Sequence, residues 1–94
     1  MSGIERQDSE GKGSYSLSGP GGAVARLTFS KAGATMIIID STEVPDAFRG
    51  QGVGVSLVAR AVEDVRAAGL KIIPLCPFAA AQFQRHPEWA DVLK

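Results

Sequence analysis

The chain of 94 residues has few of the side chains that mark disulfide, redox or metal chemistry, with one cysteine, Cys76, and one histidine, His86. One cysteine cannot form a disulfide within the chain. One cysteine and one histidine also predict no metal site, because structural zinc takes about four ligands. No apolar run approaches the roughly 20 residues of a membrane-spanning helix, and the residues up to Gly13 lack the apolar core of a signal peptide. We therefore expect a cytoplasmic protein with no membrane partner.

The chain also lacks an excess of charge of either sign, since ten lysine and arginine residues balance ten aspartate and glutamate residues. Nucleic acids and anionic membrane surfaces attract basic patches, so this balance argues against both classes of partner. Apolar residues make up 45% of the chain and charged residues 21%, which is typical of a globular protein. A chain of this length holds one small domain with a modest core.

Residues 1–13 contain mostly serine, glycine and charged side chains, which predicts a flexible tail. Residues 14–94 are then expected to form a single domain. Alternating apolar residues and turn-forming glycines predict three successive strands in an antiparallel meander, at 14–18, 23–30 and 35–44. The apolar run in the third strand, Met36 to Ile39, predicts that this strand is buried on both faces.

Beyond the third strand, apolar residues recur at helical spacing from Val53 to Ala68, and Gly69 suits the end of that helix. A short apolar strand is predicted at 71–75, and a second helix at 79–85. The resulting order is β-β-β-α-β-α. It predicts an α/β (α+β) fold in which a β-α-β crossover joins two parallel strands.

The sequence Arg49-Gly50-Gln51-Gly52-Val53-Gly54 stands between the third strand and the first helix. A helix N-terminus presents unpaired N–H groups and the positive end of the helix dipole, and glycine lets an anion approach the backbone closely. The loop therefore predicts a phosphate-binding site. It is not a Walker A motif, because no Gly-Lys-Ser/Thr follows, and its G-x-G-x-G spacing differs from the dinucleotide-binding fingerprint.

The loop resembles the coenzyme A pyrophosphate loop of the GNAT superfamily, the acetyl-CoA-dependent N-acetyltransferases, whose pattern is Gln/Arg-x-x-Gly-x-Gly/Ala. Arg49, Gly52 and Gly54 fill its three defining positions. Val44 stands five positions before Arg49, where the superfamily has the hydrophobic end of a strand. Four blocks in order look like the small, single-domain GNAT-like family: Thr42-Glu43-Val44, the glycine loop, Pro74 to Phe78, and Arg85-His86-Pro87-Glu88.

This resemblance implies a minimal GNAT-like fold with a C-terminal helix, in which the two parallel strands splay apart and acetyl-CoA binds in the gap as co-substrate, without a metal. It implies that the backbone of Glu43 and Val44 pairs with the pantetheine arm, and that the N–H groups of Gln51 to Gly54 hold the pyrophosphate. The implied reaction transfers acetyl to a primary amine. The residues implied for coenzyme binding are Val44, Arg49, Gly50, Gln51, Gly52, Val53 and Gly54.

Two side chains are candidates for the proton chemistry of such a reaction. Glu43 is a candidate base, or else a solvated carboxylate at a strand end. Cys76 follows the second parallel strand, and its thiol is a candidate to protonate the leaving thiolate, to carry the acetyl group, or simply to fill the core. The nucleophile role needs a neighbour that lowers the thiol pKa from about 8.5. His86 is predicted to cap or pack the last helix rather than to act on substrate.

The chain departs from the superfamily pattern in three places. Many members carry a tyrosine acid in the last helix, where this chain has Gln82 and Phe83, and relatives in the small family often carry histidine at the position of Ser41. Nothing before Ser14 matches the superfamily's N-terminal helices. We therefore expect an open acceptor side that suits the amine of a protein, a peptide or a polyamine. A coenzyme A-binding sensor or interaction module with little or no catalysis is the alternative, and the chain is expected to be a monomer or a weak dimer.

Overall fold

The computed structural model describes residues 3–94, so the first two residues of the predicted tail lie outside the described part. Residues 3–94 form five strands, two α-helices and three short 3-10 turns. The strands are β1 (Glu5–Ser9), β2 (Lys12–Ser18), β3 (Val24–Ala32), β4 (Met36–Glu43) and β5 (Lys71–Pro74). The helices are α1 (Val53–Ala68) and α2 (Pro77–Arg85), and the 3-10 turns are η1 (Pro20–Gly22), η2 (Asp46–Phe48) and η3 (Pro87–Val92).

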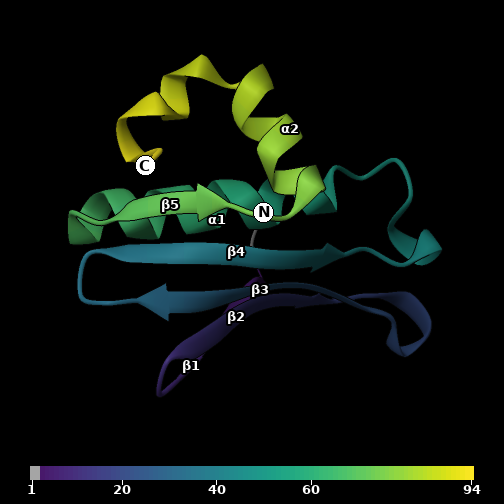
Figure 1. The fold of residues 1–94 in the computed structure, drawn as a ribbon. Helices are drawn as coiled ribbons and strands as arrows, with labels where there is room; N and C mark the ends of the chain where they lie inside the picture. Colours follow the sequence, from purple (N-terminus) through teal and green to yellow (C-terminus); the bar gives the residue numbers. More distant parts are fainter. Residues whose placement is uncertain (1–2) are drawn as a thin grey trace.

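The strands form one sheet in the order β1-β2-β3-β4-β5, which Figure 1 shows from bottom to top. Neighbouring strands from β1 to β4 run antiparallel, and β5 runs parallel to β4 after the crossover through α1. In this view α1 lies behind β5, and α2 lies beyond the β5 edge. The C-terminus returns to that edge, where Leu93 bridges Ile72. The predicted meander, crossover and C-terminal helix are confirmed.

The helix α1 begins and ends at the predicted residues, because a glycine stands at each end. Gly52 and Gly69 both adopt left-handed backbone angles, with φ of 65° and 72°, which other residues adopt only with strain. The apolar residues that recur at helical spacing in the sequence form the buried face of the helix. The buried residues are Val53, Gly54, Leu57, Val58, Ala61, Val62 and Val65. This face packs on the sheet and joins one continuous core, which Phe83 and Trp89 complete as predicted.

The prediction that β4 is buried on both faces is wrong. Ile37 and Ile39 are buried, with 4% and 0% of their surfaces exposed, whereas Met36 and Ile38 are only partly buried. The reason is that α1 covers the face that carries Ile37 and Ile39. The opposite face of the meander is polar, and there Thr28 and Ser41 share a hydrogen bond of 2.7 Å.

The predicted tail is also wrong for residues 5–13, which form β1 and the start of β2. All five residues of β1 are exposed, so no apolar alternation marks this strand in the sequence. Arg6 holds the strand in place by donating hydrogen bonds to Asp8, to the Tyr15 hydroxyl and to Asp64 of α1. The Tyr15 hydroxyl in turn donates to Asp64 at 2.8 Å. The backbone ladder with β2 and this charged network, rather than burial of apolar side chains of β1, therefore attach the first strand to the domain.

Among residues 3–94, no helix combines the length and the apolar character that crossing a membrane requires.

The charged network predicts a pH-dependent part of the stability. Burial of Asp64 opposes its ionisation, but hydrogen bonds from Tyr15 and Arg6 outweigh that effect and lower its pKa. A lowered folded pKa stabilises the protein above the unfolded pKa of about 4, and this stability is lost as pH falls through the folded pKa. We expect Asp64→Asn to reduce the free energy of unfolding at pH 7 by about 1 kcal/mol.

Urea unfolding of Asp64→Asn and wild type across pH 7 to 2.5 checks this expectation. The difference between the two proteins should narrow below about pH 4. The control is Asp91→Asn, whose partner Arg66 lies in an exposed ion pair, and which should lose less stability at pH 7. An Asp64→Asn difference that is constant over the whole range would contradict the assignment.

Candidate functional site

The parallel ladder between β4 and β5 is short, and it ends at the proposed gap. The paired residues run from Met36 with Lys71 to Ile39 with Pro74. Pro74 has no N–H group to continue the ladder, while β4 runs on to Glu43 beside β3. The N–H group of Cys76 donates to the Ile39 carbonyl at 3.0 Å. The two strands therefore separate beyond Ile39, and Cys76 is held at the point of separation.

A bulge in β4 decides which side chains face this gap. The pairing with β3 shifts by one residue, so that Phe29 faces Ile39 but Thr28 faces Ser41. Since the extra residue reverses the alternation of side chains, Thr42 lies opposite the buried Leu27. Without the bulge, Thr42 would point to the other face of the sheet. The bulge thus brings the Thr42 hydroxyl onto the same face as Cys76.

Cys76 lies at the N-cap of α2 and is buried, with 6% of its surface exposed. Its thiol donates to the Thr42 hydroxyl oxygen across 3.6 Å. Burial alone raises the pKa of this thiol, but hydrogen bonds from the backbone of Ala79 and Phe78 and from Thr42 outweigh burial and lower the pKa below its ordinary value. The start of α2 and Thr42 are therefore the neighbours that a thiolate at this position needs.

The glycine loop is organised by backbone hydrogen bonds that the sequence does not show. The Arg49 N–H donates to the Asp46 carbonyl, and the Gln51 N–H donates to the Phe48 carbonyl at 3.1 Å. Gly50 and Gly52 have φ of 78° and 65°, so both positions need glycine. The predicted anion site included the Gln51 N–H, but that group is engaged within the loop.

The first turn of α1 supplies the donors that remain. The first backbone bond of the helix runs from the Ser56 N–H to the Gly52 carbonyl. The N–H groups of Val53, Gly54 and Val55 precede this bond, so helix geometry provides them with no carbonyl partner. They lie at the positive end of a 16-residue helix, which is a favourable place for an anion.

A hollow of about 220 Å³ opens beside this helix start. Its floor includes Gly54, against which the ring of Phe78 is packed: a Cβ atom at Gly54 would lie 2.7 Å from Phe78 Cζ and 3.4 Å from Val44 Cγ2. Gly54 is therefore required for the close approach of α1, β4 and α2. The hollow is lined by Val44, Phe48, Arg49, Gly50, Gly52, Val53, Gly54, Val55 and Phe78.

Of the two charged candidates, Arg49 lines the hollow, and Glu43 does not. Arg49 pairs with Asp46 at 3.5 Å, and both side chains are exposed, at 81% and 92%, so the pair is weak and the guanidinium is available. Glu43 lies opposite Arg26 in the sheet and is exposed. Neighbouring residues of a strand point to opposite faces. Glu43 and the Thr42–Cys76 pair therefore lie on different faces of β4.

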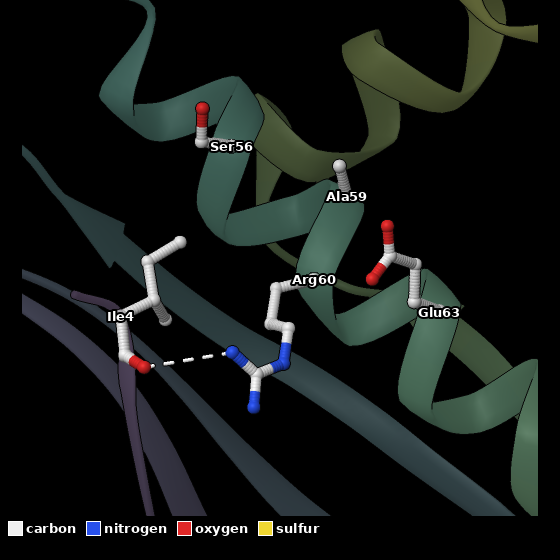
Figure 2. Close-up of a pocket in the computed structure, with 5 residues that line it drawn as sticks. All are labelled: Ile4, Ser56, Ala59, Arg60 and Glu63. Atoms are coloured by element: carbon white, nitrogen blue, oxygen red, sulfur yellow. Dashed lines mark hydrogen bonds between the residues drawn. The ribbon is translucent and has the colours of Figure 1, made fainter. Parts of the chain in front are cut away.

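A second hollow of about 250 Å³ lies on the outer side of α1, as Figure 2 shows. It is lined by Ile4, Ser56, Ala59, Arg60 and Glu63, and Arg60 donates to the Ile4 carbonyl across it. This hollow contains neither a glycine loop nor a cysteine. Its polar side chains connect α1 to the start of the chain and show no convergent binding geometry, so it is the weaker candidate for a ligand site.

Other sequence candidates are accounted for by packing. His86 stacks on Trp89 with ring centres 4.1 Å apart, and its Nδ1 contacts Glu88 at 3.0 Å. Tyr15, the one tyrosine, is buried in the core with its hydroxyl on Asp64. Within the described residues 3–94, no group of three or more histidine, cysteine or acidic side chains is arranged to hold a metal ion.

Comparison with known proteins agrees with this geometry. A family model described as GCN5-related N-acetyl-transferase matches residues 14–92. The chain belongs to that family. It is therefore an acyltransferase, and the predicted family and enzyme class are confirmed.

A solved structure extends the likeness of this acetyltransferase to the whole chain. It is the NMR solution structure of a GCN5-like protein from Staphylococcus aureus, described there as a candidate N-acetyltransferase. The two chains are 34% identical, with a TM-score of 0.74, and the match covers 100% of this chain and 91% of the other. A comparison with curated proteins found no match.

Sequence reasoning missed three residues of the site in this acetyltransferase. The contact of Thr42 with Cys76 depends on the bulge, for which the sequence has no clear signal. Phe78 and Phe48 line the hollow, although each reads in the sequence as an ordinary core residue. The sequence gives a partial signal for the contact of Phe78, because a glycine stands at position 54. In the structure Gly54 has no positive φ, and its lack of a side chain makes room for the Phe78 ring.

The environment of Cys76 makes a prediction about its ionisation. We expect the thiol to titrate below the ordinary cysteine pKa, and Thr42→Val to raise that pKa, because valine keeps the shape but removes the hydroxyl that donates to the thiolate. The pH dependence of thiolate absorbance, or of alkylation rate, measures both. Ser41→Ala is the control, since Ser41 bonds to Thr28 instead. A thiol that titrates identically in Thr42→Val and wild type would exclude Thr42 from this role.

Proposed function

We propose that this acetyltransferase binds acetyl-CoA in the hollow between β4, α1 and α2, and transfers the acetyl group to a primary amine. One observation carries the proposal: the glycine loop and the first turn of α1 line one hollow together with Phe78, which stands two residues after Cys76, and the Cys76 N–H is bonded at the end of the parallel strand pair. A phosphate-bearing carrier bound at the loop would extend along β4 toward the thiol. The family membership of the chain supports the same reaction class.

The pyrophosphate would bind at the helix start. The N–H groups of Val53, Gly54 and Val55 point away from the helix body and carry the positive end of the helix dipole. Gly50 and Gly52 add no Cβ atoms, and nothing lies within 4 Å of the place where their Cβ atoms would be. The exposed Arg49 would add a charge to the phosphates, while the backbone amides supply most of the binding.

The pantetheine arm would bind beside β4. Beyond Ile39, this strand has no β5 partner on its free side, so its N–H and C=O groups are open to pairing with the amides of a ligand, in the manner of an added strand. Glu43 and Val44 provide the last of these backbone groups. An amide aimed at the thioester oxygen would stabilise the oxyanion of the tetrahedral intermediate.

Two routes through Cys76 complete the chemistry. In direct transfer, the amine nitrogen attacks the thioester carbon, the bond from carbon to the coenzyme sulfur breaks, and the Cys76 thiol or water gives a proton to the leaving thiolate. In the covalent route, the Cys76 thiolate attacks first, coenzyme A leaves, and the amine then displaces Cys76 from the acetyl group. The lowered pKa of Cys76 favours the covalent route, because it increases the thiolate fraction at neutral pH.

The acceptor would approach from the exposed polar face of the sheet. Glu43 lies on that face and is our candidate base for the amine, directly or through a water molecule. No helix covers this face within the described residues, which suits an amine on a protein, a peptide or a polyamine. We include in the proposal a cytoplasmic location and a monomer or weak dimer.

A second candidate function is a coenzyme A-binding sensor or interaction module with little catalysis. One observation favours it: on α2, where many members of the superfamily have a tyrosine acid, this chain carries the buried Gln82 and Phe83, neither of which titrates. Under this alternative the loop binds the coenzyme as described, but the thiol serves only to pack the core.

The loop assignment predicts that a carboxylate at Gly52 prevents coenzyme binding. We expect Gly52→Glu to weaken acetyl-CoA binding at least about tenfold, because the charge repels the pyrophosphate and competes for the helix amides. Titration calorimetry measures the affinity. The control is Gly33→Glu, since Gly33 has φ of 67° against 65° for Gly52 and equally open surroundings, but lies in the β3–β4 turn. Equal affinities for the two variants would rule out the loop, and a wild type that does not bind at millimolar acetyl-CoA would rule out the function.

The role of the thiol predicts a loss of catalysis without a loss of binding. We expect Cys76→Ser and Cys76→Ala to lower kcat for acetyl transfer about 100-fold, with the acetyl-CoA affinity unchanged. Steady-state kinetics on a panel of amines checks this, with Ser41→Ala as the control. Full transfer by both variants would leave the thiol a packing residue. If wild type acetylates no amine above the uncatalysed rate, the binding module is the better description.

A further inference from the structure

The turn between β2 and β3 contacts Phe48, the residue that directly precedes the glycine loop. Gly19 precedes η1 of that turn, and a Cβ atom on Gly19 would lie 2.5 Å from Cζ of Phe48. The Phe48 ring is buried, with 3% of its surface exposed. No real Cβ atom stands so close to a ring carbon, so the ring occupies space that only a glycine leaves free.

The backbone at Gly19 does not itself require glycine. Its φ of −138° and ψ of −162° describe extended backbone that any residue adopts. The turn is closed by the Gly19 N–H, which donates to the Ala23 carbonyl at 2.8 Å, and this bond would tolerate a side chain. In Gly50 and Gly52, by contrast, the positive φ explains the glycine. At Gly19 the contact with Phe48 is the physical reason for the missing side chain.

Phe48 is built into the loop that binds the phosphates in our proposal. Its N–H donates to the Pro45 carbonyl at 3.0 Å, and its carbonyl accepts the Gln51 N–H at 3.1 Å. Its ring lines the hollow together with Gly50 and Gly52. Because the buried ring has little room to rotate, we expect its displacement to be passed to the backbone between Pro45 and Gln51, whose two hydrogen bonds both involve Phe48.

We propose that Gly19 is a positioning residue for the glycine loop: it admits the Phe48 ring beneath the loop and so sets the geometry of Gly50, Gln51 and Gly52. The β2–β3 turn is then part of the coenzyme site, although it lies outside every motif of the sequence. The geometric half of this proposal stands on the contact alone, and its consequence for acetyl-CoA rests on the proposed function.

The experiment compares Gly19→Ala with a matched substitution at the other end of β2. Gly13→Ala also inserts a methyl group into an aromatic ring, since a Cβ atom on Gly13 would lie 2.7 Å from Cε1 of the buried Phe29. Gly13 likewise has no positive φ. The two variants thus share the overpacking but differ in which ring they displace.

Two measurements separate positioning from stability. Without ligand, Gly19→Ala should shift the NMR amide resonances of residues 50–54, and Gly13→Ala should not. With ligand, Gly19→Ala should weaken acetyl-CoA binding about fivefold or more, and Gly13→Ala should bind as wild type does. Unchanged loop resonances in Gly19→Ala, or the same shifts in both variants, would overturn the proposal. If Gly19→Ala shifts the loop resonances but wild type itself binds no acetyl-CoA, the positioning role of Gly19 is upheld and the proposed function is refuted.

A rescue variant tests whether Gly19 acts through the ring, and covers the case in which Gly19→Ala fails to fold. Phe48→Leu shortens the side chain, so adding Gly19→Ala to it should leave both the loop resonances and the acetyl-CoA affinity as they are in Phe48→Leu alone. Suppose that Gly19→Ala shifts the loop resonances as much in the Phe48→Leu background as in wild type. Gly19 then does not act through Phe48, and the proposal is wrong. If Gly19→Ala alone does not fold, any loop shift between the double variant and Phe48→Leu alone leads to the same conclusion.

Discussion

The short parallel ladder between β4 and β5 fixes the position of Cys76 and leaves the end of β4 unpaired on that side. Pro74 ends the ladder because it has no N–H group. Two residues later, the Cys76 N–H group donates one more hydrogen bond to β4, at the Ile39 carbonyl. This bond holds the thiol at the end of the paired region while β4 continues alone. A longer β5 would close the gap in which we propose that a linear ligand binds, and a shorter one would remove the hydrogen bond that holds Cys76. The bulge in β4 matters for the same reason, since it turns Thr42 toward the thiol.

Close approach of backbone to aromatic rings holds the remaining elements around this gap. Gly13, Gly19 and Gly54 are all in ordinary backbone conformations, and each lies where a Cβ atom would enter a phenylalanine ring. The ring of Phe29 joins β3 to β2, the ring of Phe48 joins the glycine loop to the β2–β3 turn, and the ring of Phe78 joins α2 to α1. A domain of 94 residues has a small core. A phenylalanine ring packed on a glycine brings two elements closer together than two packed side chains would allow.

The sequence predicted the parts of the fold that local patterns determine. The helix Val53–Ala68 was predicted with its observed bounds, since apolar spacing and two flanking glycines all lie within one segment. The strand Glu5–Ser9 was not, because a charge network with Tyr15 and Asp64 holds it in place and no apolar pattern marks it. The loop residues of the candidate site came from a contiguous motif. The contact of Thr42 with Cys76 and the role of Gly19 did not, since they depend on a bulge and on a ring contributed by a distant segment.

The two halves of the proposed reaction therefore differ in how strongly the structure supports them. Coenzyme binding would use backbone amides and glycines, whose positions follow from a helix start and from positive φ angles. Proton transfer would use side chains, and here the bulge places Thr42 beside Cys76 but turns Glu43 to the opposite face. A base and an acid on opposite faces of one strand suit a reaction in which the amine arrives from one side and the thiolate leaves on the other. In the proposed reaction, that separation would place Cys76 on the coenzyme side while the acceptor side stays open, so an enzyme of this size would need no enclosed acceptor pocket.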